Sequence, residues 1–360
     1  MNKNTSIYLD FLRVFSALGV IVCHANMEYF SSGLELCNIE FGHKMVVIFF
    51  VLSGFLIAYT TDIKNKDLHG YIVDRVSRLY PVIIPALFLT LFMDQIGYLF
   101  NPQYYREYVT SVAYYIKYIV TFFNLHEIWF SSAKPPTNVP FWSLAYEVWY
   151  YIIFAIWIYT TKSKRLMLLL LTVICIGYKM LLLFPVWLMG VALYKLSKLR
   201  ISNVLAVFIF LVSICFIAGI ITETIHPVFP FASTIGDPHF FFSYDFINDN
   251  FLGILICLNI FAMNSITWNI WNESSFFVQK VKWFSSVTFS VYLYHYPIMI
   301  FCGAIGFYNK GNLIQVLGLT LFIVLITILL AQVTEQKRYF IKQHFEKLYA
   351  RYILRKKIMQ

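Results

Sequence analysis

The chain has 360 residues, of which 60% are hydrophobic and only 13% charged, and its mean hydropathy is +0.69. About a quarter of the residues of a soluble domain are charged, so this composition excludes an ordinary soluble enzyme. The net charge of +10 is compatible with nucleic-acid binding, but excess Lys and Arg in a multi-pass protein usually marks cytoplasmic loops. Because no basic-aromatic RNA motif is present, we expect a membrane protein that binds no nucleic acid.

The first apolar segment, about 7–28, carries an acid, a guanidinium and an imidazole: Asp10, Arg13 and His24. Arg13 and His24 are eleven positions apart, which places them on nearly the same helix face, about 16 Å apart along the axis. Ionisable groups inside a bilayer are costly and normally face a bundle interior or a water-filled path. The segment therefore predicts a helix that lines a polar route.

The rest of the chain predicts an all-α polytopic protein with about ten transmembrane helices and both termini in the cytoplasm. The expected spans are 7–28, 43–61, 79–100, 140–160, 166–183, 185–197, 203–222, 250–268, 284–307 and 312–333. The stretch 101–139 mixes apolar and charged residues, and we interpret it as an outer re-entrant or interfacial segment. If it crossed the membrane, several later basic loops would face outward, against the usual distribution.

This interpretation makes residues 1–335 one transmembrane domain and residues 336–360 a basic cytoplasmic tail. The tail is rich in Lys, Arg and aromatic residues, which is typical of an amphipathic helix on the anionic inner leaflet. A solvated basic tail is the alternative. The six cysteines show no CxxC pairing or metal spacing, so we expect packing roles and no metal site.

Polar residues also occur in and after the second span. Ser53 precedes a glycine that permits close helix approach, so it either packs at a helix interface or lines the polar route. His43 and Lys44, at the outer end of this span, are interpreted as ordinary interface residues. Arg75 and Arg78 stand one turn apart at the next membrane boundary, where arginines bind phosphate or simply set topology and contact lipid headgroups.

Two later spans carry further ionisable groups. Glu147 lies about two turns into the fourth span and needs a partner there. It either pairs with Arg13 or a neighbouring helix, or it orients an imidazole or an acceptor hydroxyl. His295, beside the kink-forming Pro297, is either a satisfied core histidine or an active group. His24 is the best chemical candidate, because imidazole exchanges protons near neutral pH and can act as a nucleophile.

Five motifs follow one another in order along the chain. They are Arg13 with ten residues before His24, the run from Phe49 to Leu56 containing Ser53, Arg75-x-x-Arg78 before Pro81, Trp142-Ser143-Leu144 with Glu147, and the run from Tyr292 to Pro297 containing His295. Together they resemble the membrane acyltransferase-3 family, polytopic enzymes that O-acylate bacterial surface polysaccharides. Each motif alone is weak, but their order covers nearly the whole chain.

The resemblance implies acetyl-CoA or another acyl-CoA as the donor, with His24 and Arg13 essential to the transfer. On this basis we expect catalytic roles for His24, Arg13 and Glu147, donor-binding roles for Arg75, Arg78 and Ser53, and acceptor-binding roles for Trp142, Ser143 and His295. Arg13 is expected toward the cytoplasm and His24 toward the outer face. Family members often carry an acid shortly before the Phe-Phe pair, whereas this chain has Val46, Val47 and Ile48 there.

The expected function is transfer of an acetyl or other short acyl group from cytoplasmic acyl-CoA to a hydroxyl of a cell-surface or lipid-linked polysaccharide. The protein is expected in the bacterial cytoplasmic membrane. No SGNH-type hydrolase domain is expected after the last span, so the bundle acts alone or with a separate periplasmic partner. Two alternatives stay open: a glycan or lipid-linked transporter without acyl chemistry, and an acyltransferase whose acceptor is a small molecule or a lipid.

Overall fold

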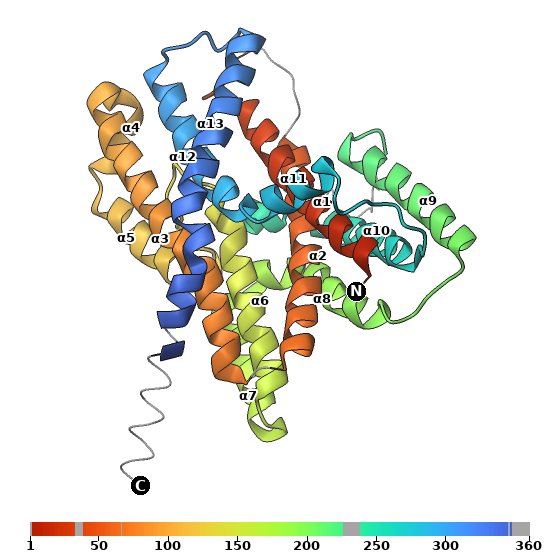
Figure 1. Cartoon of the computed structure of the whole chain (residues 1–360). Coiled ribbons are helices and arrows are strands. Elements are labelled where there is room, and N and C mark those ends of the chain that lie inside the picture. The colour runs from red at the N-terminus through yellow and green to blue at the C-terminus, as the bar shows by residue number, and fades with distance from the viewer. Residues whose placement is uncertain (1, 33–38, 66, 226–237, 345, 348–360) are drawn as a thin grey trace.

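The structure is a computed structural model that describes residues 2–32, 39–65, 67–225, 238–344 and 346–347. The described chain is helical, with short connections (Figure 1). Its elements are α1 (Lys3–Ala25), α2 (Ile39–Lys64), α3 (Leu68–Phe100), α4 (Pro102–Val109), α5 (Val112–Phe122), α6 (Phe141–Tyr159), α7 (Lys162–Ile176), α8 (Tyr178–Leu196), α9 (Asn203–Ile221), η1 (Pro238–Ser243), α10 (Phe246–Ser265), α11 (Phe276–Ser285), α12 (Thr288–Ile305), α13 (Leu313–Val333) and η2 (Glu335–Lys337).

Nine helices of the described chain are long and apolar enough to cross a membrane: α1, α2, α3, α6, α8, α9, α10, α12 and α13. This confirms the all-α polytopic fold. The apolar stretch of α12 is 78% buried, whereas those of α9 and α13 are only 28% buried. A helix that is apolar on all sides can lie in the core or face lipid, and these fractions place α12 in the centre and α9 and α13 at the edge.

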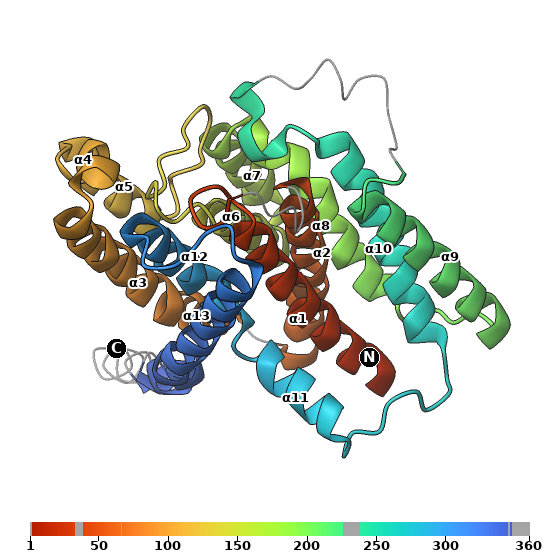
Figure 2. The ribbon, with the colours of Figure 1, turned by 90° about the horizontal axis from the view of Figure 1, so that it is seen from above.

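Figure 2 shows α12 enclosed by α1, α3 and α13, all of which contact it. Pro297 lies inside this helix and has no N–H to bond the carbonyl one turn earlier. The side-chain amide of Asn138 donates to that carbonyl, on Leu293, at 3.1 Å. A buried backbone group that the proline leaves without its helical partner is thus satisfied from the segment that leads into α6.

The boundary between α7 and α8 differs from the sequence-based expectation. The break lies at Gly177, where φ is +77° and a Cβ would come within 2.9 Å of the Cα of Trp129. The amide of Trp129 donates to Ile176 at 3.0 Å, so α7 ends beside the loop that leads into α6. Since α7 also begins where α6 ends, its 15 residues run back along α6 from that end, and α7 is shorter than the nine helices that can cross a membrane.

The segment 101–139 contains no spanning helix among the described elements. Its helices α4 and α5 have 8 and 11 residues, well short of the roughly 20 that a crossing needs. Asp94 of α3 holds α5 in place, because its carboxylate accepts hydrogen bonds from Tyr114 and from Tyr118, the latter at 3.0 Å. Thr137 donates to the same carboxylate at 2.7 Å. Helix α5 runs back along α3, because Tyr80 of α3 donates to the carbonyl of Phe122 at the end of α5 at 3.3 Å. The segment therefore re-enters the bundle beside α3 and returns to the start of α6 without a spanning helix.

Both ends of the described chain lie at one end of the bundle. Asn2, ahead of α1, donates to Asn264 at the end of α10 at 2.8 Å. Glu335, after α13, accepts from the backbone amide of Ser290 in the first turn of α12. Most of the expected tail, 348–360, lies outside the described residues, but its helical beginning contacts the bundle through an ion pair of Lys342 with α3.

Candidate active site

Helix α1 runs past two cavities. We call the first the arginine cavity, which has an empty volume of about 650 Å³. Its polar lining comes from α1, α2, α3, α6 and α12: Arg13, Ser53, Arg78, Ser143, Glu147, Thr288 and Tyr292. Ser53 is brought there by a tight approach of α2 to α8, since a Cβ on the adjacent Gly54 would lie 2.0 Å from a backbone oxygen of α8. Sequence motifs far apart in the chain therefore meet in one cavity.

The carboxylate in this cavity does not neutralise the two guanidiniums directly. Glu147 accepts hydrogen bonds from Ser53 at 2.5 Å and from Tyr151. Arg13 approaches Asp10 only to 3.8 Å, and no described carboxylate lies within 4.0 Å of Arg78. Guanidiniums bind phosphate and carboxylate in bidentate fashion, so this wall of the cavity is suited to an anion.

Arg75 does not share this cavity. Its guanidinium lies over the rings of Tyr71 and Tyr151, 5.8 and 5.4 Å from their centroids, and it lines neither cavity. Cation–π contacts of this kind stabilise a side chain without a counter-ion. The structure therefore brings Arg78 to the cavity with Arg13, and it places Arg75 one turn away against aromatic rings.

The second cavity, which we call the histidine cavity, has an empty volume of about 970 Å³. Its polar and aromatic lining consists of His24, Glu40, His43, Trp142, Phe241, Phe242, Tyr244 and Tyr292. The ring of Phe242, from η1, stacks on Trp142 with centroids 4.4 Å apart and planes 6° apart. Aromatic faces beside hydroxyl and carboxylate groups make a wall that suits a ligand with apolar and polar sides.

A chain of hydrogen bonds sets the tautomer of neutral His24. Nδ1 of His295 lies 3.0 Å from the carbonyl oxygen of Val291, and because a carbonyl only accepts, this nitrogen carries the proton. Nε2 of the neutral His295 then has the lone pair, which accepts from Nδ1–H of His24 at 2.8 Å. In neutral His24, Nε2 is consequently the unprotonated ring nitrogen, as a general base or a nucleophile requires.

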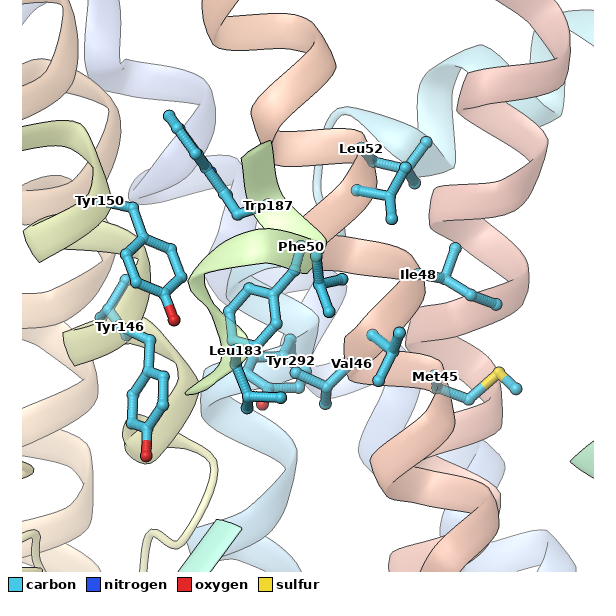
Figure 3. Close-up of a cluster of buried hydrophobic side chains, with 14 of the residues drawn as sticks. Met45, Val46, Ile48, Phe50, Leu52, Tyr146, Tyr150, Leu183, Trp187 and Tyr292 are labelled. Atoms are coloured by element: carbon cyan, nitrogen blue, oxygen red, sulfur yellow. The ribbon is translucent and has the colours of Figure 1, made fainter. Parts of the chain in front are cut away.

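The two cavities meet at Val46 and Tyr292, which line both. Figure 3 shows these two side chains beside each other, in the layer that also contains Phe50. The hydroxyl of Tyr292 lies 2.9 Å from Oγ of Ser143 and donates to Pro140 at 3.3 Å, which holds the ring in place. The two cavities thus lie on either side of a constriction formed by these two side chains.

The expected site residues divide between these places. Trp142 lines the histidine cavity and its neighbour Ser143 the arginine cavity. Glu147 lies with the arginines, so the residue that orients His24 is His295. His295 is completely buried and lines neither cavity, which places it behind the imidazole instead of on the acceptor surface.

Interpretation of the sequence missed one pair. His43 does not behave as an ordinary interface residue, because it lines the histidine cavity and its Nε2 lies 2.8 Å from Asp249 of α10. The two residues are 206 positions apart. The only signal in the sequence is an acid and a histidine that each stand near the end of an apolar segment, and nothing local joins them.

Comparison with known proteins identifies the family. Residues 6–332 match the family model described as an acyltransferase domain. The chain belongs to this acyltransferase family. The match confirms the resemblance drawn from the five motifs, and it covers both cavities.

Two curated relatives of this acyltransferase-family chain have names that state an activity. YrhL of Bacillus subtilis (strain 168), by its name a candidate peptidoglycan O-acetyltransferase, is 33% identical over 172 residues, which are 43% of this chain and 25% of YrhL. O-acetyltransferase OatA of Staphylococcus aureus (strain NCTC 8325 / PS 47) is 30% identical over 162 residues, 41% of this chain and 23% of OatA. The matched region therefore spans about a quarter of each relative. No solved structure matches the chain.

Proposed function

We propose that the protein is an O-acyltransferase that moves an acetyl or other short acyl group from acyl-CoA to a hydroxyl of a polysaccharide of the peptidoglycan type, free or lipid-linked. One observation carries the proposal. A single helix, α1, presents Arg13 to a cavity suited to an anion and His24 to a second cavity, and the two cavities meet. This arrangement joins a phosphorylated donor to an acceptor hydroxyl across a membrane-spanning bundle.

The donor enters at the end of the bundle that holds both chain ends. Arg13 and Arg78 bind the phosphates of CoA, and the acyl-bearing arm extends toward the constriction. We assign this end to the cytoplasm, because the helix ends and hairpins there carry most of the lysines and arginines. These include Lys64, Lys162, Lys164, Arg165, Lys195, Lys198 and Arg200. We propose the bacterial cytoplasmic membrane as the protein's location.

The acceptor occupies the histidine cavity from the opposite side. A sugar ring has an apolar face and a rim of hydroxyls, which matches a cavity lined by the aromatic side chains of Trp142 and Phe242 and the carboxylate of Glu40. The name of YrhL, a candidate peptidoglycan O-acetyltransferase, favours a peptidoglycan-type acceptor. A separate periplasmic protein that presents the glycan is compatible with this geometry.

The chemistry then follows from His24. Its Nε2 takes the proton of the acceptor hydroxyl while the hydroxyl oxygen attacks the thioester carbonyl carbon. The tetrahedral intermediate collapses, the C–S bond breaks, and the leaving thiolate takes the proton back from His24. His295 keeps the imidazole in the required tautomer throughout. In the alternative path, Nε2 attacks the thioester itself and carries the acyl group before the acceptor arrives.

Reconstituted protein with labelled acetyl-CoA on one side and ester-free glycan strands from Bacillus subtilis walls on the other tests the proposal. We expect base-labile label on the glycan, a loss of at least about a hundredfold in His24→Gln, and full activity in His344→Gln, which replaces an exposed histidine. Label trapped on the protein after a brief pulse indicates the acyl-enzyme path. Glycan carried across without any ester supports a transporter and contradicts the proposal.

A further inference from the structure

A second ionisable pair faces the histidine cavity. Nε2 of His43 lies 2.8 Å from Oδ2 of Asp249, and the two side chains are only 7% and 1% exposed. A buried carboxylate is stable only with a hydrogen-bonded or charged partner, and Nε2–H of His43 supplies it. The ring of His43 is held between Trp142, whose plane is 11° from its own at 5.7 Å, and Tyr244 at 5.5 Å.

This pair is close to His24. Helices α1 and α2 touch at Cys23 and Gly42, where a Cβ on the glycine would lie 2.7 Å from the cysteine sulfur. His24 and His43 directly follow these two contact residues, and both line the same cavity. A substrate bound in this cavity is therefore in contact with a wall that contains both imidazoles.

The imidazoles of His24 and His43 donate to partners of different charge. His24 donates to the lone pair of a neutral ring, His295, which leaves its Nε2 free of a proton. His43 donates to a carboxylate, Asp249, which favours a proton on both ring nitrogens. Titratable groups with such divergent surroundings usually divide the roles of acid and base in one reaction.

We propose that His43, kept protonated by Asp249, donates the hydrogen of its Nδ1 to the oxyanion of the transfer reaction; this inference rests on the proposed function. When the acceptor oxygen attacks, the carbonyl π electrons move to the oxygen, and Nδ1–H binds that negative charge. On collapse the C–S bond breaks and the carbonyl re-forms. His43 retains its proton, while the proton of the hydroxyl passes through His24 to the CoA sulfur.

Two further acids around His43, Glu40 on its own helix and Asp245 before α10, favour the cationic form, whereas burial opposes it. The other titratable groups near the ring are Tyr244 before α10 and Cys23 and His24 on α1. Tyr244 donates to Glu40, so that carboxylate is held in the same wall. The nearby cation, Lys44, is paired with Glu223 at 3.6 Å and lines neither cavity.

The dependence of the rate on pH tests this role in the reconstituted transfer assay. The wild type should show a bell-shaped profile whose high-pH decline reports loss of the proton from His43. His43→Gln should lower kcat by about a hundredfold to a thousandfold, as expected for loss of an oxyanion donor, and abolish that decline. Asp249→Asn should move the decline to lower pH, and it should add no further shift in the His43→Gln background.

A control variant and a folding check complete the test. Lys44→Gln, which changes the neighbouring residue outside the cavity, should behave as wild type. Each variant is first compared with wild type by size-exclusion chromatography in detergent; if Asp249→Asn does not fold, His43→Gln and His43→Asn decide. A wild type that transfers no acetyl group overturns the proposed function and this inference with it. An active wild type whose high-pH decline survives in both His43 variants overturns this inference alone.

Discussion

His295 should act on the reaction only through the proton that His24 carries. Replacement by Leu removes the acceptor 2.8 Å from Nδ1 of His24 and leaves that N–H unpaired in a protein wall. An unpaired buried donor costs about 1–3 kcal/mol. At 1.36 kcal/mol per tenfold, this corresponds to roughly tenfold to a hundredfold in kcat. Gln has a similar size and keeps an acceptor oxygen, so His295→Gln should retain most of the activity.

Initial rates of acetyl transfer at saturating and limiting acetyl-CoA separate the two variants. Because His295 lines neither cavity, the KM for acetyl-CoA should stay within about twofold in both, and the loss should appear in kcat. Thermal melting in detergent identifies any general unfolding. Equal rates for well-folded His295→Leu and His295→Gln would refute the tautomer argument, as would a loss confined to KM.

Three further results are expected. Arg78→Gln should raise the KM for acetyl-CoA at least about tenfold, since a charged hydrogen bond contributes about 1.5–3 kcal/mol. Arg165→Gln, which changes a residue outside both cavities, should leave this KM unchanged. Equal KM values for the two variants would exclude Arg78 from the donor site. Gly54→Ala should lower the melting temperature, because its Cβ would meet a backbone oxygen at 2.0 Å, whereas Gly318→Ala, with nothing within 4 Å, should leave it unchanged or raise it slightly. Burial lowers the pKa of His126 to about 4, below its unfolded value of about 6.5. The stability that the neutral form contributes at neutral pH, at most about 3 kcal/mol, should therefore be lost as pH falls from about 6.5 through 4. The melting temperature should fall less steeply with decreasing pH in His126→Gln than in the wild type.

Local periodicity was sufficient to predict much of the site. The eleven-residue spacing of Arg13 and His24 set their common face on α1, because a helix repeats every 3.6 residues. It did not show that they line different cavities, because Val46 and Tyr292, which lie at the constriction, come from two other helices. Position along one helix is a local property, whereas the shape of a cavity depends on packing.

The missing partners were all distant in sequence. His295 lies 271 positions from His24, and Asp249 lies 206 from His43. One sequence contains no signal for such pairs. It therefore favours Glu147, which is nearer in the motif order, for orienting His24, whereas Glu147 accepts a hydrogen bond from Ser53. The boundary at Gly177 was readable in principle, since glycine commonly ends a helix.

The constriction at Val46 and Tyr292 also bears on the cell's energy supply. A polar route through an energised membrane is a hazard, because a continuous column of water would let protons leak and dissipate the electrochemical gradient. A narrow point with apolar carbon on one side excludes water, and the fixed positive charges of Arg13 and Arg78 beneath it repel cations. The same two side chains that lie between the two cavities would thus insulate the membrane.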